Sequence, residues 1–66
     1  MFDGRLIRKI REEKDINQLD IYVKSKIRPD HLSRIENNQI PNVGIDTLSR
    51  IADAIGCEVA DFMAKE

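Results

Sequence analysis

Residues 17–38 carry the signals for two short helices joined by a tight turn. Asn17 is a favourable N-cap residue, and Asp20 follows three positions later, which makes a variant of the capping box. Pro29 suits the first position of a second helix, and Asp30 adds negative charge to its first turn, where the helix dipole favours it. The stretch therefore predicts a helix-turn-helix, an arrangement that can place its second helix in the major groove of DNA.

The second of these helices is expected to have one apolar and one polar face. Leu32 and Ile35 are three positions apart and should face the core. The helix is expected to end at Asn37 and Asn38, because Asn tolerates the left-handed backbone conformation found after helices. The residues left on the outward side are Pro29, Asp30, Ser33, Arg34 and Asn37, with His31 at the border.

The remaining segments are also predicted to be helical. No segment alternates apolar and polar residues in the manner of a strand, so the fold class is expected to be all-α. One helix should precede the pair at about residues 3–14, and two should follow at about 45–55 and 58–64, the former closed by Gly56. The apolar residues expected to face inward are Leu6, Ile7, Ile10, Leu48, Ile51, Ala52 and Ile55.

The length of the chain favours a single domain, expected to span residues 1–66. A chain of this size buries a limited core, which an all-α fold suits. The single cysteine, Cys57, cannot form an internal disulfide, which fits the reducing cytoplasm. We find no signal peptide and no apolar run of about 20 residues that could cross a membrane.

Catalytic and metal-binding patterns are not found in the sequence. There is no glycine-rich phosphate loop, nucleophile elbow or HExxH motif, so we do not expect an enzyme. His31 is the only histidine, and with one distant cysteine it cannot supply the three or four protein ligands usual for zinc. Neither a cofactor nor a small-molecule ligand is indicated.

Taken together, these segments resemble the lambda-repressor/Cro-type helix-turn-helix domains, also called the xenobiotic-response-element (XRE) family. The resemblance implies a compact five-helix domain that binds duplex DNA as a dimer. It also implies an ion pair between Arg11 and Glu36, which would link the first helix to the third. The segments that carry it are IRKIREEK (7–14), NQLDI (17–21), LSRIENN (32–38), PNVGIDTLSRIADAIG (41–56) and VADFM (59–63).

Four positions depart from the pattern of that family. Tyr22 stands where a small residue is usual, so the two helices must repack or the phenol must point outward. Lys26 replaces a usual glycine, and requires either an uncommon backbone conformation or a reshaped turn. Asn38 also stands where glycine is usual, and Pro29 where several members have a glutamine that reads adenine.

The polar face of the second helix supplies the candidates for DNA contact. Arg34 can contact guanine through two hydrogen bonds, although it can also pair with Asp30 one turn away. Asp30 can accept from cytosine or merely restrain Arg34. Pro29 has no side-chain donor or acceptor and can only make an apolar contact with a thymine methyl. The other candidates suit phosphate contacts, with ordinary solvation or turn chemistry as the alternative. The full set is Gln18, Arg28, Pro29, Asp30, His31, Ser33, Arg34, Asn37, Asn38 and Gln39.

The charge distribution bears on the partner. The net charge is −1, whereas a nucleic-acid binder is more often basic. Residues 1–45 nevertheless carry nine Lys and Arg against seven Asp and Glu, while residues 46–66 carry two against five. With this distribution the acidic end would face away from DNA, and the family resemblance implies a sequence-specific transcriptional regulator, more a repressor than an activator, that binds a palindromic operator as a homodimer. The candidates for the dimer contact, which can also simply close the core, are Val59, Phe62 and Met63.

The alternative is a protein-interaction module, such as an antitoxin-like or antirepressor-like chain. The acidic C-terminal third favours this second hypothesis, because it suits a protein partner better than DNA.

Overall fold

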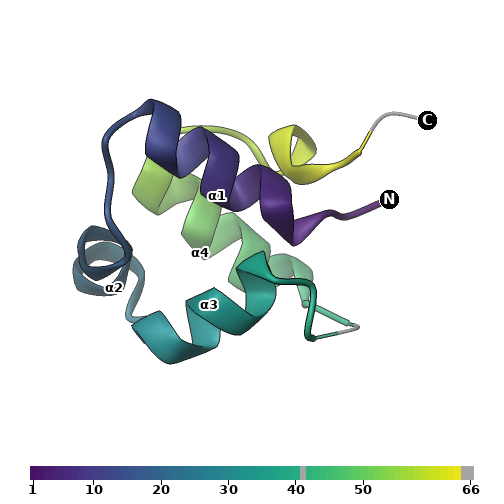
Figure 1. Ribbon diagram of the computed structural model, residues 1–66, viewed down its shortest axis with the longest axis horizontal. Coiled ribbons are helices and arrows are strands. Elements are labelled where there is room, and N and C mark those ends of the chain that lie inside the picture. Colours follow the sequence, from purple (N-terminus) through teal and green to yellow (C-terminus); the bar gives the residue numbers. More distant parts are fainter. Residues whose placement is uncertain (41, 65–66) are drawn as a thin grey trace.

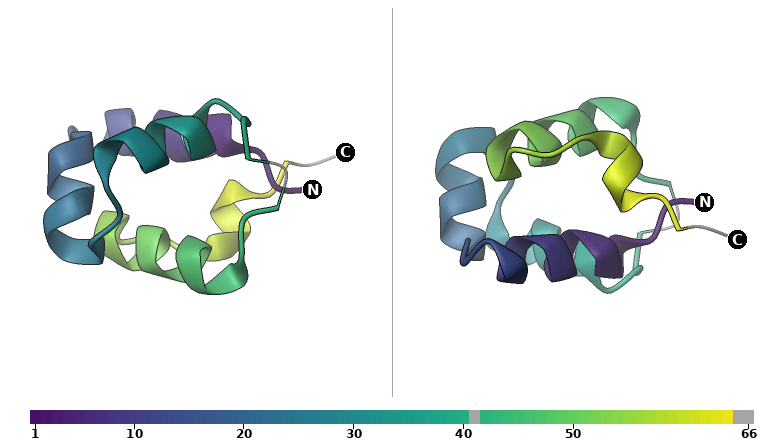
Figure 2. Two further views of the ribbon diagram at one scale, coloured as in Figure 1. Left: turned by 90° about the horizontal axis from the view of Figure 1, so that it is seen from below. Right: turned by 90° about the horizontal axis from the view of Figure 1, so that it is seen from above.

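The computed structural model describes residues 1–40 and 42–64 and contains four α-helices followed by a 3-10 helix. Helices α1 and α3 lie side by side, α4 lies across from them, and α2 closes one end (Figure 2). The N-terminus and η1 lie at the opposite end from α2 (Figure 1). The elements are α1 (Gly4–Glu13), α2 (Gln18–Ser25), α3 (Pro29–Glu36), α4 (Ile45–Ile55) and the 3-10 helix η1 (Val59–Phe62).

The all-α helix-turn-helix fold predicted from the sequence is confirmed, and the predicted caps account for its boundaries. Asn17 accepts from the backbone N–H of Asp20, whose side chain accepts from the N–H of Asn17, so the capping box is complete. Pro29 occupies the first turn of α3. Gly56 ends α4 in the left-handed conformation, with φ of 91°.

The last element differs from the expectation. An α-helix was expected over residues 58–64, but the chain forms the four-residue 3-10 helix η1 and then turns extended at Met63. The reason is a contact between the two ends of the chain. Met63 forms an antiparallel bridge with Phe2, and the N–H of Asp3 donates to the carbonyl oxygen of Phe62 at 2.9 Å. These pairings replace the hydrogen bonds that a further helical turn would make.

The core is formed by side chains from every element. Most of the predicted inward residues are buried, but Leu6 and Ile10 are only half-buried, because they lie at the edges of the inner face of α1. Ala54 is buried although the helical pattern did not single it out. The residues with no exposed surface are Ile7, Ile21, Leu32, Ile35, Ile51 and Phe62.

The turn between α2 and α3 explains two of the departures from the family pattern. Lys26 adopts the left-handed conformation itself, with φ of 65°, so the turn is not reshaped. The buried Ser25 supports this turn, because its hydroxyl donates to the carbonyl of Ile21 at 2.6 Å and accepts from the N–H of Ile27 at 3.1 Å. Tyr22 points outward and is 40% exposed, so the helices need not separate to accommodate it.

Replacing Lys26 with glycine is expected to stabilise the fold. A left-handed conformation costs an L-residue about 1–2 kcal/mol, and the greater freedom of glycine in the unfolded chain offsets about 0.5–1 kcal/mol of that gain. Lys26→Gly should therefore raise the free energy of unfolding by about 0.5–1 kcal/mol, measured by urea denaturation. Lys24→Gly, inside α2, is the matched control and should lower it. A destabilised Lys26→Gly protein would contradict this account of the turn.

Candidate nucleic-acid interface

The outward face of α3 is polar, as the sequence predicted, and it lies on the outside of the fold (Figure 2). Leu32, Ile35 and Glu36 turn inward and are buried. Pro29 and Ser33 are half-buried at the edge of the exposed surface. The exposed residues of the helix and its C-terminal extension are Asp30, His31, Arg34, Asn37, Asn38 and Gln39.

Arg34 forms no ion pair with any residue that the structure describes. The pairing with Asp30 that the sequence left open is not formed, because Asp30 pairs with Arg28 instead, with 3.8 Å between Nε and Oδ1. Both partners of that pair are largely exposed, so it contributes little stability. The guanidinium of Arg34 therefore keeps its donors available for a ligand of the exposed face.

Behind this face, Arg11 and Glu36 form a buried ion pair between α1 and α3. Nε and Nη2 of Arg11 donate to the two carboxylate oxygens of Glu36, at 2.9 and 3.1 Å. The side chains are only 10% and 3% exposed. The third nitrogen of Arg11 donates to the carbonyl of Ile16 at 3.0 Å, so the pair also holds the segment before α2. The geometry of this buried pair gives Glu36 a structural role, holding α3 against α1.

The same carboxylate positions Gln18 at the start of α2. Nε2 of Gln18 donates to Oε1 of Glu36 at 3.2 Å, and Gln18 is half-buried. Its other donor hydrogen and its carbonyl oxygen have no side-chain partner in the part of the chain that the structure describes. Gln18 is thus held beside α3 with capacity to bind a further group.

A surface groove lies between α1, the start of α2 and α3. Its walls are mostly polar. Side-chain amide and guanidinium donors of this kind bind the phosphates of a nucleic-acid backbone. Asn37 belongs to it, and one of its amide hydrogens already donates to the carbonyl of Ser33 at 2.9 Å. The residues lining the groove are Arg8, Arg11, Asn17, Gln18, Ser33, Glu36 and Asn37.

Arg8 is the residue of this groove that the sequence reasoning missed. It is exposed on α1 and lies 3.6 Å from Glu12 in an i, i+4 pair at the surface. Because it precedes Arg11 by three positions, the two side chains lie on adjoining parts of the same helix face. That spacing is the signal that could have found it.

Asn38 and the dimer candidates are placed differently from the other predicted residues. The amide of Asn38 binds two residues of the protein itself, Asp3 and Gly4. Phe62 is fully buried, so it closes the core and offers no surface to a second copy. Val59 and Met63 are half-buried against the core.

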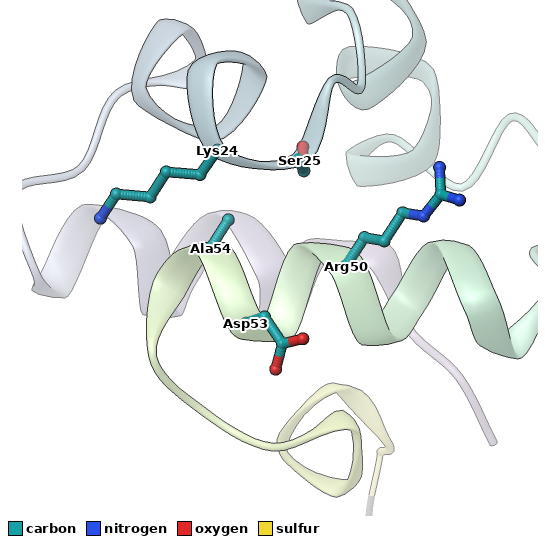
Figure 3. A pocket seen from close by; sticks show the side chains of 5 residues that line it. All are labelled: Lys24, Ser25, Arg50, Asp53 and Ala54. Atoms are coloured by element: carbon teal, nitrogen blue, oxygen red, sulfur yellow. The ribbon is translucent and has the colours of Figure 1, made fainter.

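A second depression, between α2 and α4, does not gather its polar groups. Lys24 and Arg50 extend in opposite directions from it, and the carboxylate of Asp53 points away from both (Figure 3).

Partial burial raises the pKa of the Cys57 thiol, so it is protonated at neutral pH. Among residues 1–40 and 42–64, no three His, Cys, Asp or Glu side chains lie together as metal ligands would. No helix in these two ranges is sufficiently long and apolar for a membrane span.

Comparison with known proteins gives one match. The model of a family described as "Helix-turn-helix" matches residues 7–62, which cover all four α-helices except the first turn of α1, and η1 as well. No curated protein and no solved structure matches the chain.

Proposed function

We propose that this chain, which belongs to the helix-turn-helix family of XRE-type DNA-binding transcription regulators, is a repressor that binds a palindromic operator as a homodimer. The observation that carries this proposal is the exposed polar face of α3, with Arg34 uncommitted to an ion pair among the described residues. All the groups that it requires lie in one domain, residues 1–66. The protein would act in the cytoplasm, and repression would follow from occlusion of the polymerase.

In this proposal α3 enters the major groove and its neighbours bind the DNA backbone. Arg34 would donate two hydrogen bonds to guanine, Asp30 would accept from cytosine, and Pro29 would contact a thymine methyl. Contacts to phosphate fix the register of the helix without reading sequence. We assign the phosphate contacts to Gln18, Arg28 and Asn37, and to Arg8 in the surface groove of the protein. His31, Ser33 and Gln39 would contact phosphate at the edge of the exposed face of α3.

The shape of the molecule supports a dimer on DNA. The half-sites read by two recognition helices lie about 34–36 Å apart, one turn of the double helix. The longest dimension of the protein is 31 Å, which is also the distance between the centres of two copies that meet end to end, so such a dimer has a size that suits this half-site spacing. The end that carries the N-terminus offers apolar surface, since Met1 is 88% exposed and the paired residues Phe2 and Met63 are half-buried. We assign the dimer contact to this end, with Val59 nearby.

The proposal is tested by selecting binding sites from a pool of randomised duplexes and footprinting the protein on the selected DNA. We expect a sequence with two-fold symmetry and protection over both half-sites. A footprint over one half-site, from a protein that stays monomeric on DNA, would contradict the dimer.

Arg34→Ala tests the assignment of base reading. The substitution should weaken binding to the selected duplex by about 1–3 kcal/mol and relax the preference at one base pair of each half-site. Arg50→Ala removes the same charge from the exposed surface of α4 and is the matched control, expected to bind nearly as wild type. An equal loss on selected and random DNA would make Arg34 a phosphate contact.

Pro29→Gln tests which way α3 faces. Gln is acceptable at a helix start, so the fold should be kept, but its amide can read adenine where Pro29 can offer only an apolar contact. Selection with this variant should change the preferred base at one position of each half-site. The same preferred sequence for both proteins would show that Pro29 does not face the bases.

A specific observation favours the alternative of a protein-interaction module. Three apolar side chains on α2 are exposed: Leu19 at 60%, Tyr22 at 40% and Val23 at 63%. Together with the acidic C-terminal third, this surface suits a protein partner. A gel shift on the DNA upstream of the protein's own gene separates the two functions, because an interaction module would leave that DNA unshifted at physiological salt.

A further inference from the structure

Asn38 follows the recognition helix, and both ends of its side-chain amide are bound within the protein. Its Oδ1 accepts from the backbone N–H of Gly4 at 2.8 Å, and its Nδ2 donates to Oδ1 of Asp3 at 3.0 Å. These partners stand 34 and 35 positions earlier in the chain. The amide therefore joins the end of α3 to the beginning of α1.

The backbone of Asn38 also ends α3. Its φ is 57°, in the left-handed region, and the N–H of the next residue, Gln39, donates back to the carbonyl of Arg34 at 2.9 Å. Glycine adopts this conformation at less cost than asparagine, but it has no side chain with which to reach α1. The conformation alone thus does not require asparagine, whereas the bonds to α1 do.

Asp3 is itself held in place. It caps α1 by accepting from the backbone N–H of Arg5 at 3.0 Å, and its own N–H donates to Phe62 at 2.9 Å. The side chain of Arg5 and the amide of Asn38, both hydrogen-bonded to the carboxylate, hold the pKa of Asp3 well below its usual range. Asp3 is therefore an ionised acceptor, in a fixed position, for the amide of Asn38.

We propose that Asn38 is a positioning residue rather than a DNA-contacting one, and that its clasp with Asp3 and Gly4 sets the last turn of the recognition helix against α1. The inference rests on the proposed function of α3. That last turn follows directly from Arg34 and leads to Asn37, and both residues are proposed to contact DNA. A turn that is loose in the free protein must therefore become ordered when DNA binds. The apparent affinity is the intrinsic affinity multiplied by the fraction of the free protein that is in the binding conformation.

Three substitutions separate the clasp from the other roles of these residues. Asn38→Gly keeps the left-handed backbone and removes the amide. Asp3→Ser keeps a good N-cap for α1, but its shorter side chain ends before it reaches Asn38. Asp3→Asn keeps an acceptor oxygen at full length and is the conservative control, expected to behave nearly as wild type. Arg5→Gln, at a largely exposed side chain, is a second control for the loss of the ion pair with Asp3.

The first measurement is hydrogen exchange at the Gln39 amide in the free protein. Asn38→Gly and Asp3→Ser should each speed this exchange about 5–10-fold, the loss expected for one hydrogen bond, while the two controls should leave it unchanged. Unchanged exchange in both variants would overturn the clasp. This measurement uses no DNA, so it decides the clasp even if the wild-type protein selects no duplex, a result that would defeat the proposed function.

The second measurement is affinity for the selected duplex. If the clasp acts as a unit, each of the two variants should bind more weakly, by at most the factor by which its Gln39 exchange rises, and the double variant should bind no more weakly than the weaker single variant. Losses that multiply in the double variant would overturn the proposal. So would wild-type affinity in Asp3→Ser beside weakened binding in Asn38→Gly, because that result would make Asn38 a direct DNA contact.

Discussion

Glu36→Ala is expected to lower the free energy of unfolding by about 3–5 kcal/mol, because it leaves the charge of Arg11 buried without a partner. The two side chains are 10% and 3% exposed and share two hydrogen bonds. The loss is a large part of the total stability of about 5–15 kcal/mol that small domains have. Urea denaturation followed by circular dichroism measures it.

The matched control removes both charges. Arg11→Met combined with Glu36→Leu replaces the ion pair with apolar groups, and such replacements of buried pairs are often neutral or stabilising. The double variant should therefore be more stable than Glu36→Ala alone, although Gln18 loses its partner in both. A melting temperature unchanged by Glu36→Ala would refute the role given to this pair.

Gly4→Ala is the second substitution with a large expected effect. A Cβ at Gly4 would lie 1.8 Å from the carbonyl oxygen of Ile35, which belongs to the backbone of α3 and cannot turn aside as a side chain can. We expect a loss of about 3 kcal/mol, the upper part of the range for overpacked sites, because α1 and α3 must move apart. Binding to the selected duplex should weaken as well, since α3 is displaced.

Gly44→Ala is the control for Gly4→Ala. No atom lies within 4 Å of a Cβ built at Gly44, and its φ of −66° suits any residue. Its effect on unfolding should be a loss of about 0.5–1 kcal/mol, because alanine is a poorer N-cap residue than glycine. Equal stability of the two alanine variants would show that α1 and α3 do not meet at Gly4 as described.

The local features of the helix-turn-helix could be predicted because they depend on neighbours in the chain. The capping box at Asn17 and Asp20, Pro29 at the start of α3 and the left-handed end at Asn38 each act within one turn of helix. The period of Leu32 and Ile35 likewise fixes which side of α3 is buried. The polar, exposed face of α3 follows from these local signals alone.

What sequence reasoning missed depends on contacts between distant segments. The hydrogen bonds of the Asn38 amide reach Gly4 and Asp3, which stand 34 and 35 positions earlier, so no local pattern in the sequence predicts them. The predicted last helix is shortened because Met63 pairs with Phe2 at the other end of the chain. The sequence around Gly4 does not show that a side chain is excluded there, because the contact that excludes it forms only where α1 meets α3 in the folded protein.

The proposed function requires the exposed face of α3 to read base sequence in duplex DNA. The most direct measurement is the ratio of affinities for the selected duplex and for a scrambled duplex of the same composition, at one physiological salt concentration. The account predicts that wild type favours the selected duplex by about 10³-fold or more, as specific DNA-binding proteins do, and that Arg34→Ala reduces this ratio. Equal affinity of the wild type for both duplexes, or no enrichment in the selection, would contradict the claim.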